Sequence, residues 1–110
     1  MAGLDTSWKT GSRVIHLEDV FRYLRVKRRR VHRMPARSLY KMLGRRLNIQ
    51  KRRMMRADIS APIILVVDRE TRRPEVVLDG NHRLAKAVTM KRDIPFRILY
   101  SDEYEMLFGT

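Results

Sequence analysis

The chain contains no cysteine, which excludes disulfide bonds and thiolate metal sites. Its three histidines are scattered without the paired spacing of zinc ligands, so we expect no metal site built from histidine. No apolar run approaches the roughly 18 residues that a membrane-crossing helix needs. The N-terminus also lacks the basic and then apolar segments of a signal peptide. These absences predict a cytoplasmic protein with no membrane partner.

Internal repeats are absent as well, and the size and composition favour one folded domain. The chain has 110 residues, of which 44% are hydrophobic, enough for a modest core. Residues 1–11 show no clear periodicity and are expected to form a flexible lead-in. The folded domain should therefore span residues 12–110.

Hydrophobic spacing predicts alternating strands and helices. Strands are expected at residues 12–17, 63–67, 75–78 and 94–100, and the run at 63–67 is apolar throughout, as in a strand buried on both faces. The short connection between the second and third of these strands indicates an antiparallel hairpin. Helices are expected at 19–27, from 35 to between 43 and 47, in a basic stretch that starts near 51 and ends near 56, after Gly80 and after Tyr100. The predicted fold class is a small α+β domain, a mixed sheet of about four strands with helices packed on it.

Acidic residues are missing from one long stretch. Between Arg22 and Arg56 the sequence has fifteen lysines and arginines and no aspartate or glutamate, and this segment holds the whole excess behind the net charge of +13. Such a segregated field attracts polyanions. The first interpretation is a nucleic-acid partner, with DNA ahead of RNA. An acidic protein partner and a merely solubilising face are the alternatives.

Within this segment, residues 27–30 are expected to be exposed because burying such a run without opposite charges is costly. Arg37, Lys41 and Arg45 recur at helical spacing and should line one basic helical face. Gly44 also allows a helix-turn-helix interpretation, although its packing positions fit poorly. Met54 and Met55 are expected to be core residues. The candidate nucleic-acid-binding residues are Arg28, Arg29, Arg30, Arg33, Arg37, Lys41, Arg45, Arg46, Lys51, Arg52 and Arg53.

The second candidate site is the sequence Asp79-Gly80-Asn81-His82-Arg83, which should lie where a buried strand turns into a helix. The first N–H groups of a helix lack internal partners and favour anions. Gly80 permits a positive φ, Arg83 can offer a bidentate fork, and His82 can donate or accept a proton near neutral pH. A phosphate or nucleotide site at Gly80, Asn81, His82 and Arg83 is therefore predicted.

The same residues resemble the Gly-x-x-Arg box of the ParB/sulfiredoxin superfamily. The likeness continues in residues 61–67, similar to the central strand of that fold, and in residues 94–99, similar to the strand after its helix. Asn81 stands where sulfiredoxins carry a catalytic cysteine, so that chemistry is excluded. The ParB box helps to bind CTP, and the Asp-Gly-His-His-Arg box of free-serine kinases handles nucleotide phosphates. The resemblance thus implies Asp79, His82 and Arg83 as phosphate contacts and a nucleoside triphosphate, CTP or ATP with Mg²⁺, as ligand.

Two classes of function follow from these features. The first is a ParB-like nucleic-acid-binding protein. Its small size and basic charge suggest a phage or mobile-element accessory protein that acts in the host cytoplasm. The second is an enzyme, either a phosphodiester hydrolase (nuclease) or a small-molecule kinase, with Asp79 and Glu18 organising Mg²⁺ and His82 moving protons. Structural roles remain open: Asp79 as a turn residue, His82 bonded to a neighbouring loop, Arg83 in an internal salt bridge, and Glu18 at a helix start.

Overall fold

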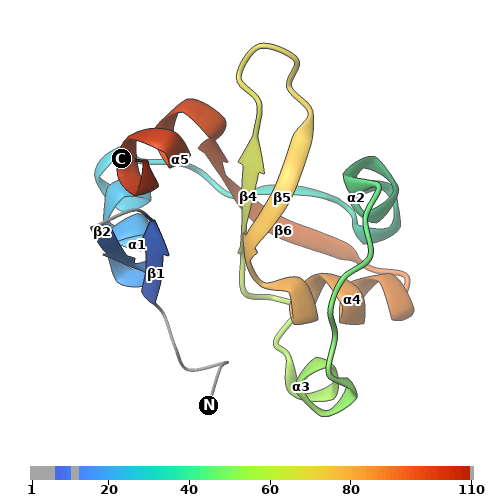
Figure 1. Cartoon of the computed structure of the whole chain (residues 1–110). Helices are drawn as coiled ribbons and strands as arrows, with labels where there is room; N and C mark the ends of the chain where they lie inside the picture. Colours follow the sequence, from blue (N-terminus) through green and yellow to red (C-terminus); the bar gives the residue numbers. More distant parts are fainter. Residues whose placement is uncertain (1–6, 11–12, 110) are drawn as a thin grey trace.

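The computed structural model describes residues 7–10 and 13–109 (Figure 1). The elements, in chain order, are β1 (Ser7–Thr10), β2 (Arg13–His16), α1 (Leu17–Val26), β3 (His32–Pro35), α2 (Ala36–Leu43), α3 (Lys51–Arg56), β4 (Ile63–Val67), β5 (Pro74–Asp79), α4 (Asn81–Thr89), β6 (Asp93–Tyr100) and α5 (Ser101–Phe108). Of the expected flexible lead-in, residues 1–6 and 11 lie outside the described residues. Ser7–Thr10 form a strand that the sequence did not predict.

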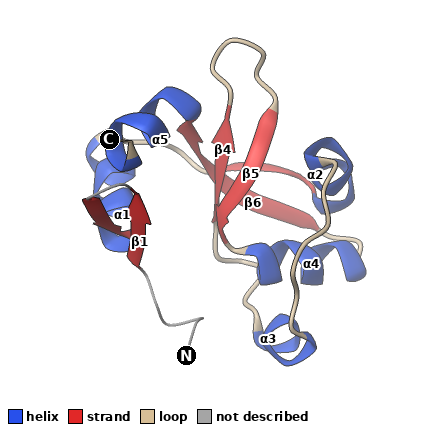
Figure 2. Ribbon diagram, viewed as in Figure 1, coloured by secondary structure: helices blue, strands red, loops and turns tan. Residues whose placement is uncertain are grey.

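The main sheet has four strands in the order β3-β6-β4-β5. β6 runs antiparallel to β3 and parallel to β4, and β4 and β5 form the expected antiparallel hairpin. The predicted α+β class with a small mixed sheet is therefore confirmed. Figure 2 shows this sheet at the centre, with the separate β1–β2 hairpin beside α1.

Helices cover both faces of the sheet. On one face, α2 and α4 contribute Leu39 and Leu84 to a core with Ile63, Leu65 and Val67 of β4. On the other face, the alternate β4 residues Ile64 and Val66 pack with side chains of α1 and α5. All five residues of β4 are buried, which confirms the expectation of a strand covered on both faces.

One strand of the predicted sheet was assigned wrongly. The strand near residues 12–17 exists as β2, but it pairs with β1 in a separate two-stranded sheet. Its expected place in the main sheet is taken by β3, which pairs with β6. β3 was not predicted because its residues lie at the end of the basic run, where the charges hide the strand pattern. In the structure these residues are alternately half-buried and exposed, as in an edge strand. Pro35 cannot donate a ladder hydrogen bond, and β3 lies at the edge of the sheet, where this is tolerated.

None of the helices in the described residues is both long and apolar enough to span a bilayer. The longest, α1, has 10 residues, whereas a transmembrane helix needs roughly 20. In this fold α1, α2, α4 and α5 instead bury their apolar sides on the sheet.

Candidate functional site: the Gly80 corner and the basic surface

The predicted strand-to-helix corner is present. β5 ends at Asp79 and α4 begins at Asn81, so Gly80 alone makes the turn, with φ of 107°. A Cβ added to Gly80 would overlap the side chain of Ile63, at 2.8 Å from its Cβ. Both the backbone conformation and the close approach to β4 therefore require glycine here.

Arg83 points back across the corner and is half-buried. Its Nη1 donates to the carbonyl oxygen of Pro62 at 3.2 Å and lies 3.5 Å from Oδ2 of Asp79. These contacts tie the start of β4 to the first turn of α4. The internal salt bridge left open by the sequence is thus formed, and one arm of the guanidinium fork is occupied within the fold.

His82 and Lys86 lie one turn apart on α4 and anchor α3 at both ends. The Nε2 atom of His82 accepts a hydrogen bond of 3.1 Å from the backbone N–H of Gln50, just before α3. The Nζ atom of Lys86 donates to the carbonyl oxygens of Met55 and Ala57, at 2.8 and 2.9 Å, where α3 ends. Burial and the nearby charge of Arg53 both lower the pKa of His82, which keeps Nε2 available as an acceptor.

These anchors matter because α3 has no buried residue of its own. A helix of six residues is unstable in isolation. Met55 is 64% exposed, and Met54 is half-buried but belongs to neither core cluster, so the expectation that both methionines enter the core is wrong. The helix starts beside His82 of the corner and ends beside Lys86. The corner therefore sets the position of a short helix in which four of six residues are basic.

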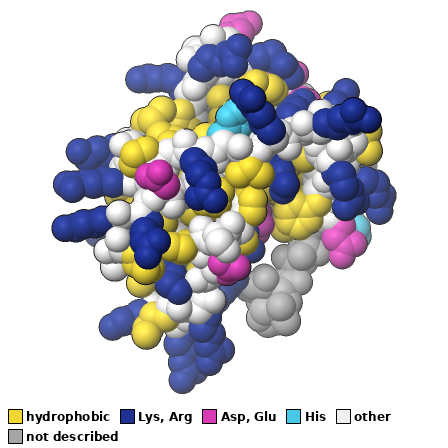
Figure 3. All heavy atoms as spheres, turned by 180° about the vertical axis from the view of Figure 1, so that it is seen from behind, with side chains coloured by type: hydrophobic (Ala, Val, Ile, Leu, Met, Phe, Trp, Pro, Cys, Tyr) yellow, Lys and Arg dark blue, Asp and Glu magenta, His cyan; other side chains and the backbone are white. Residues whose placement is uncertain are grey.

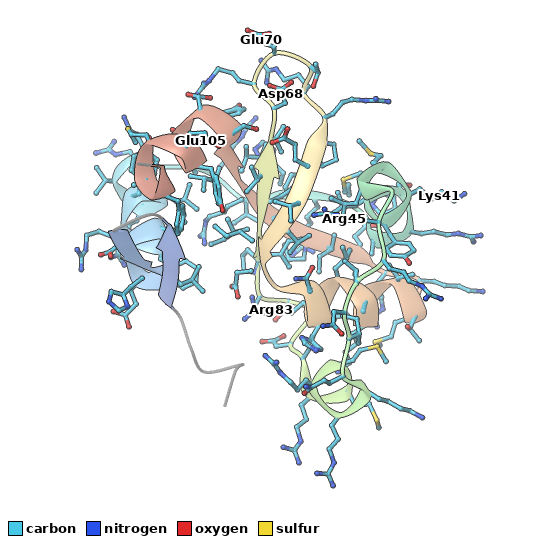
Figure 4. The ribbon with its side chains drawn as sticks, viewed as in Figure 1. Lys41, Arg45, Asp68, Glu70, Arg83 and Glu105 are labelled. Carbon is cyan, nitrogen blue, oxygen red and sulfur yellow. The ribbon has the colours of Figure 1, made fainter. Side chains whose placement is uncertain are left out.

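α3 belongs to a larger basic surface with α2 and the segment between them. We call this the α2–α3 surface. Figure 4 shows long basic side chains projecting from α2 and α3, among them Lys41, whereas the labelled acidic residues lie on other elements, Asp68 and Glu70 in the β4–β5 connection and Glu105 on α5. Its exposed basic residues are Arg37, Lys41, Arg45, Arg46, Lys51, Arg52, Arg53 and Arg56.

Two predictions about this surface need correction. α2 ends at Leu43 because Gly44 adopts a left-handed conformation, so Arg45 lies beyond the helix and does not continue the row of Arg37 and Lys41. The helix-turn-helix interpretation is also wrong. Residues 44–50 form a seven-residue connection between α2 and α3, whereas that motif has a turn of three or four residues.

The basic segment is continuous in sequence and divided in space. Arg28, Arg29 and Arg30 follow α1 on the other face of the sheet, and Arg33 lies on β3. In Figure 3, which shows the molecule from behind, lysine and arginine side chains reach several edges of the surface. The fifteen basic residues therefore do not form one continuous face.

Arg29 contradicts the expectation that residues 27–30 are all exposed. Its guanidinium pairs with the buried carboxylate of Glu103 on α5 and donates to the carbonyl oxygen of Ile98 at 3.0 Å. Burial alone would raise the pKa of Glu103, but hydrogen bonds from Arg29, from Tyr23 and from the backbone N–H of Tyr100 lower that pKa to about 2. Arg29 is thus part of an ion pair within the fold, because the acidic partner lies far away in sequence.

The residues proposed for catalysis occupy different elements. Glu18 is exposed in the first turn of α1, Asp79 ends β5, and His82 contacts the segment before α3. In the described part of the chain, no group of three or more acidic or histidine side chains could hold a metal ion. Asn81, the first residue of α4, is half-buried. The corner therefore brings Asp79 and Arg83 together and directs His82 toward α3.

The sequence missed the role of Lys86 and the partner of Arg29. Lys86 lies four residues after His82 on the same helix, so its spacing could have indicated a shared face. Glu103 is separated from Arg29 by 74 residues, and no local pattern links the two.

Comparison of the chain with protein-family models, with curated proteins and with solved structures finds no match. The resemblance of the Asp79–Arg83 motif to the ParB/sulfiredoxin box therefore stays a prediction. An α+β domain of this size can support many unrelated functions, so function has to be argued from the site itself.

Proposed function

We propose that this chain is a nucleic-acid-binding protein, in the manner of a ParB-like domain, and that the α2–α3 surface contacts the phosphate backbone of duplex DNA. The observation that carries the proposal is the placement of α3. A six-residue helix with four basic residues and no buried side chain is nevertheless anchored at both ends by His82 and Lys86.

Charge supports the same assignment. The stretch from Arg30 to Ala57 has no acidic residue, and among the described residues no ion pair involves a basic side chain of the α2–α3 surface. Positive charges placed close together repel and cost stability. An anionic ligand with regularly spaced charges, such as a nucleic-acid backbone, would relieve this repulsion and release counterions.

The anchoring argues against a purely solubilising role. Solubility needs charge on the surface but no particular position for it. Here, three hydrogen bonds from α4 hold both ends of α3. Fixing the helix in advance reduces the backbone freedom that would be lost on binding, which is the usual benefit of preorganisation.

In this proposal the Gly80 corner acts mainly through α3. Arg83 and His82 have partners inside the fold, at Pro62 and Gln50 respectively. A nucleotide at the corner, CTP or ATP with Mg²⁺, would have to share Arg83 with Asp79 and Pro62. Nucleotide binding at the Gly80 corner is therefore tested separately from DNA binding.

The test is a titration of the full chain against a fluorescent DNA duplex and an RNA duplex of the same length at several salt concentrations. The proposal expects the logarithm of the DNA-binding constant to fall steeply and linearly with the logarithm of salt concentration. Repeating the titration with ATP, CTP and Mg²⁺, and checking the DNA for cleavage, tests the nucleotide and enzyme interpretations. Absence of binding at low salt would refute the proposal and leave an acidic protein as the partner to examine.

A further inference from the structure

A cavity of about 390 Å³ lies on the face of the sheet covered by α1, away from the α2–α3 surface. Ligand pockets commonly have volumes of about 300–1,000 Å³. Its walls come from the second half of α1 and the residues just after it, the start of β4, and Arg97 of β6. The cavity thus joins elements that are far apart in sequence.

Four arginines and no acidic residue line this cavity: Arg25, Arg28, Arg29 and Arg97. The charge of Arg29 is balanced by Glu103. For Arg25, Arg28 and Arg97, no ion pair occurs among the described residues. Guanidinium groups gathered without counter-charges favour a phosphate, which they can bind through paired hydrogen bonds.

The rest of the lining is apolar. Leu24, Ile63 and Ile64 form buried walls, and Phe21 is 42% exposed at the cavity. An exposed phenyl ring beside arginines suits a ligand that has a planar ring as well as a phosphate, because bases stack on aromatic side chains and on guanidinium planes.

The backbone conformation at Arg28 is unusual and directs this residue to the cavity. α1 ends in a motif in which the N–H of Arg28 donates to Arg25 O and the N–H of Arg29 donates to Leu24 O, both at 3.0 Å. The residue between helix and loop in this motif is usually glycine, but here it is Arg28 with φ of 56°. The strained conformation places an arginine on the cavity wall, and strain of this kind often occurs at functional sites.

We propose that this cavity binds a phosphorylated nucleoside, with Arg25, Arg28 and Arg97 contacting the phosphate and Phe21 contacting the base. The cavity adjoins the Gly80 corner through Pro62 and Ile63, but Asp79, His82 and Arg83 do not line it. No basic residue of the α2–α3 surface lines it either, and the proposal does not depend on duplex DNA binding. The same chemistry occurs in a free mononucleotide and at the phosphorylated end of a single strand.

The test uses the full chain and calorimetric titration with AMP, adenosine and inorganic phosphate. The variants are Arg28→Gly and Arg97→Gln, with Lys91→Gly as the matched control. Lys91 has the same φ of 56° and the same position after a helix, with its N–H donating to Val88 O, but it does not line the cavity. Both glycine variants should be at least as stable as the wild type, because glycine adopts this conformation without strain.

AMP is expected to bind at least tenfold more tightly than adenosine or phosphate. Arg28→Gly and Arg97→Gln should each weaken AMP binding at least tenfold, whereas Lys91→Gly should change it less than twofold. No AMP binding by the wild type, phosphate binding as tight as AMP binding, or an equal loss in Lys91→Gly would overturn the proposal.

A second comparison distinguishes the two sources of the ligand. A single-stranded oligonucleotide is titrated with and without a 5′-phosphate. A gain of tenfold or more from the 5′-phosphate that disappears in Arg28→Gly assigns the cavity to strand ends. AMP binding with no gain from the 5′-phosphate assigns it to free nucleotides. Because unphosphorylated duplex DNA tests the α2–α3 surface alone, failure of one proposal can be told from failure of the other.

Discussion

Replacing Lys51, Arg52 and Arg56 of α3 together by glutamine should weaken duplex DNA binding and flatten its salt dependence. Glutamine has a helix propensity close to those of lysine and arginine, so α3 should persist. None of the three residues takes part in the hydrogen bonds that anchor α3. Arg53 is kept because its charge acts on His82.

The magnitude follows from counterion release. If each side chain neutralises one phosphate, the slope of log K against log salt should fall by about 2.7, at about 0.9 per contact. At 0.1 M salt the same contacts correspond to a loss of about 500-fold in affinity. The measurement is fluorescence anisotropy of a labelled duplex over a fourfold range of salt.

The matched control replaces Arg22, Arg72 and Arg73 by glutamine. All three are exposed, they lie on α1 and in the β4–β5 connection, and the variant loses the same net charge. Its slope should stay within about 0.5 of the wild-type slope. Equal slope changes in the two variants would refute the assignment of the contacts to α3, because only general attraction by net charge would then explain them.

Three further predictions concern the supports of the site. Gly80→Ala should lower the free energy of unfolding by about 3 kcal/mol in urea denaturation, through its positive φ and the overlap with Ile63; a loss below about 1 kcal/mol would contradict the requirement for glycine. Because the pKa of Glu103 is lowered to about 2, ionised Glu103 contributes about 3 kcal/mol to the free energy of unfolding above pH about 4.5, and this contribution should be lost as the pH falls toward 2. Glu103→Gln should remove this part of the acid dependence, and a variant with the wild-type pH profile would show that Glu103 does not cause it. The pKa of His82 is lowered, so the neutral imidazole that accepts a hydrogen bond from the Gln50 N–H should be lost only as the pH falls below about 6.5. In an NMR titration the chemical shift of the Gln50 amide should follow the protonation of His82, and an imidazole pKa above 6.5 would be inconsistent with the contact.

Elements with a strong local pattern could be predicted from the sequence. The apolar run of β4, the hairpin to β5 and the turn at Gly80 were all predictable, because burial on two faces and a strand-to-helix turn leave clear local signals. β3 could not be predicted in the same way. Its short alternation lies inside a basic run, and only pairing with β6 makes it a strand.

The site shows the same limit. The sequence indicated that residues Asp79–Arg83 lie at a corner, but whether His82 faces solvent or α3 depends on where residues 44–50 run. Likewise, the sequence showed the basic stretch clearly. Its division between the two faces of the sheet arises because β3 lies between α1 and α2 in the chain and connects one face to the other. Arg29 became an internal residue because α5 brings Glu103 to it. Such long-range contacts have no local sequence signal.

Binding of duplex DNA by the α2–α3 surface can be observed residue by residue. The most direct measurement is an NMR titration of ¹⁵N-labelled protein with a short duplex that lacks terminal phosphates, at low and at high salt. Chemical-shift changes should concentrate in residues 37–56, weaken at high salt, and leave the connection at residues 68–73 unchanged. Changes confined to α1 and α5, or no changes at low salt, would show that the α2–α3 surface does not bind duplex DNA.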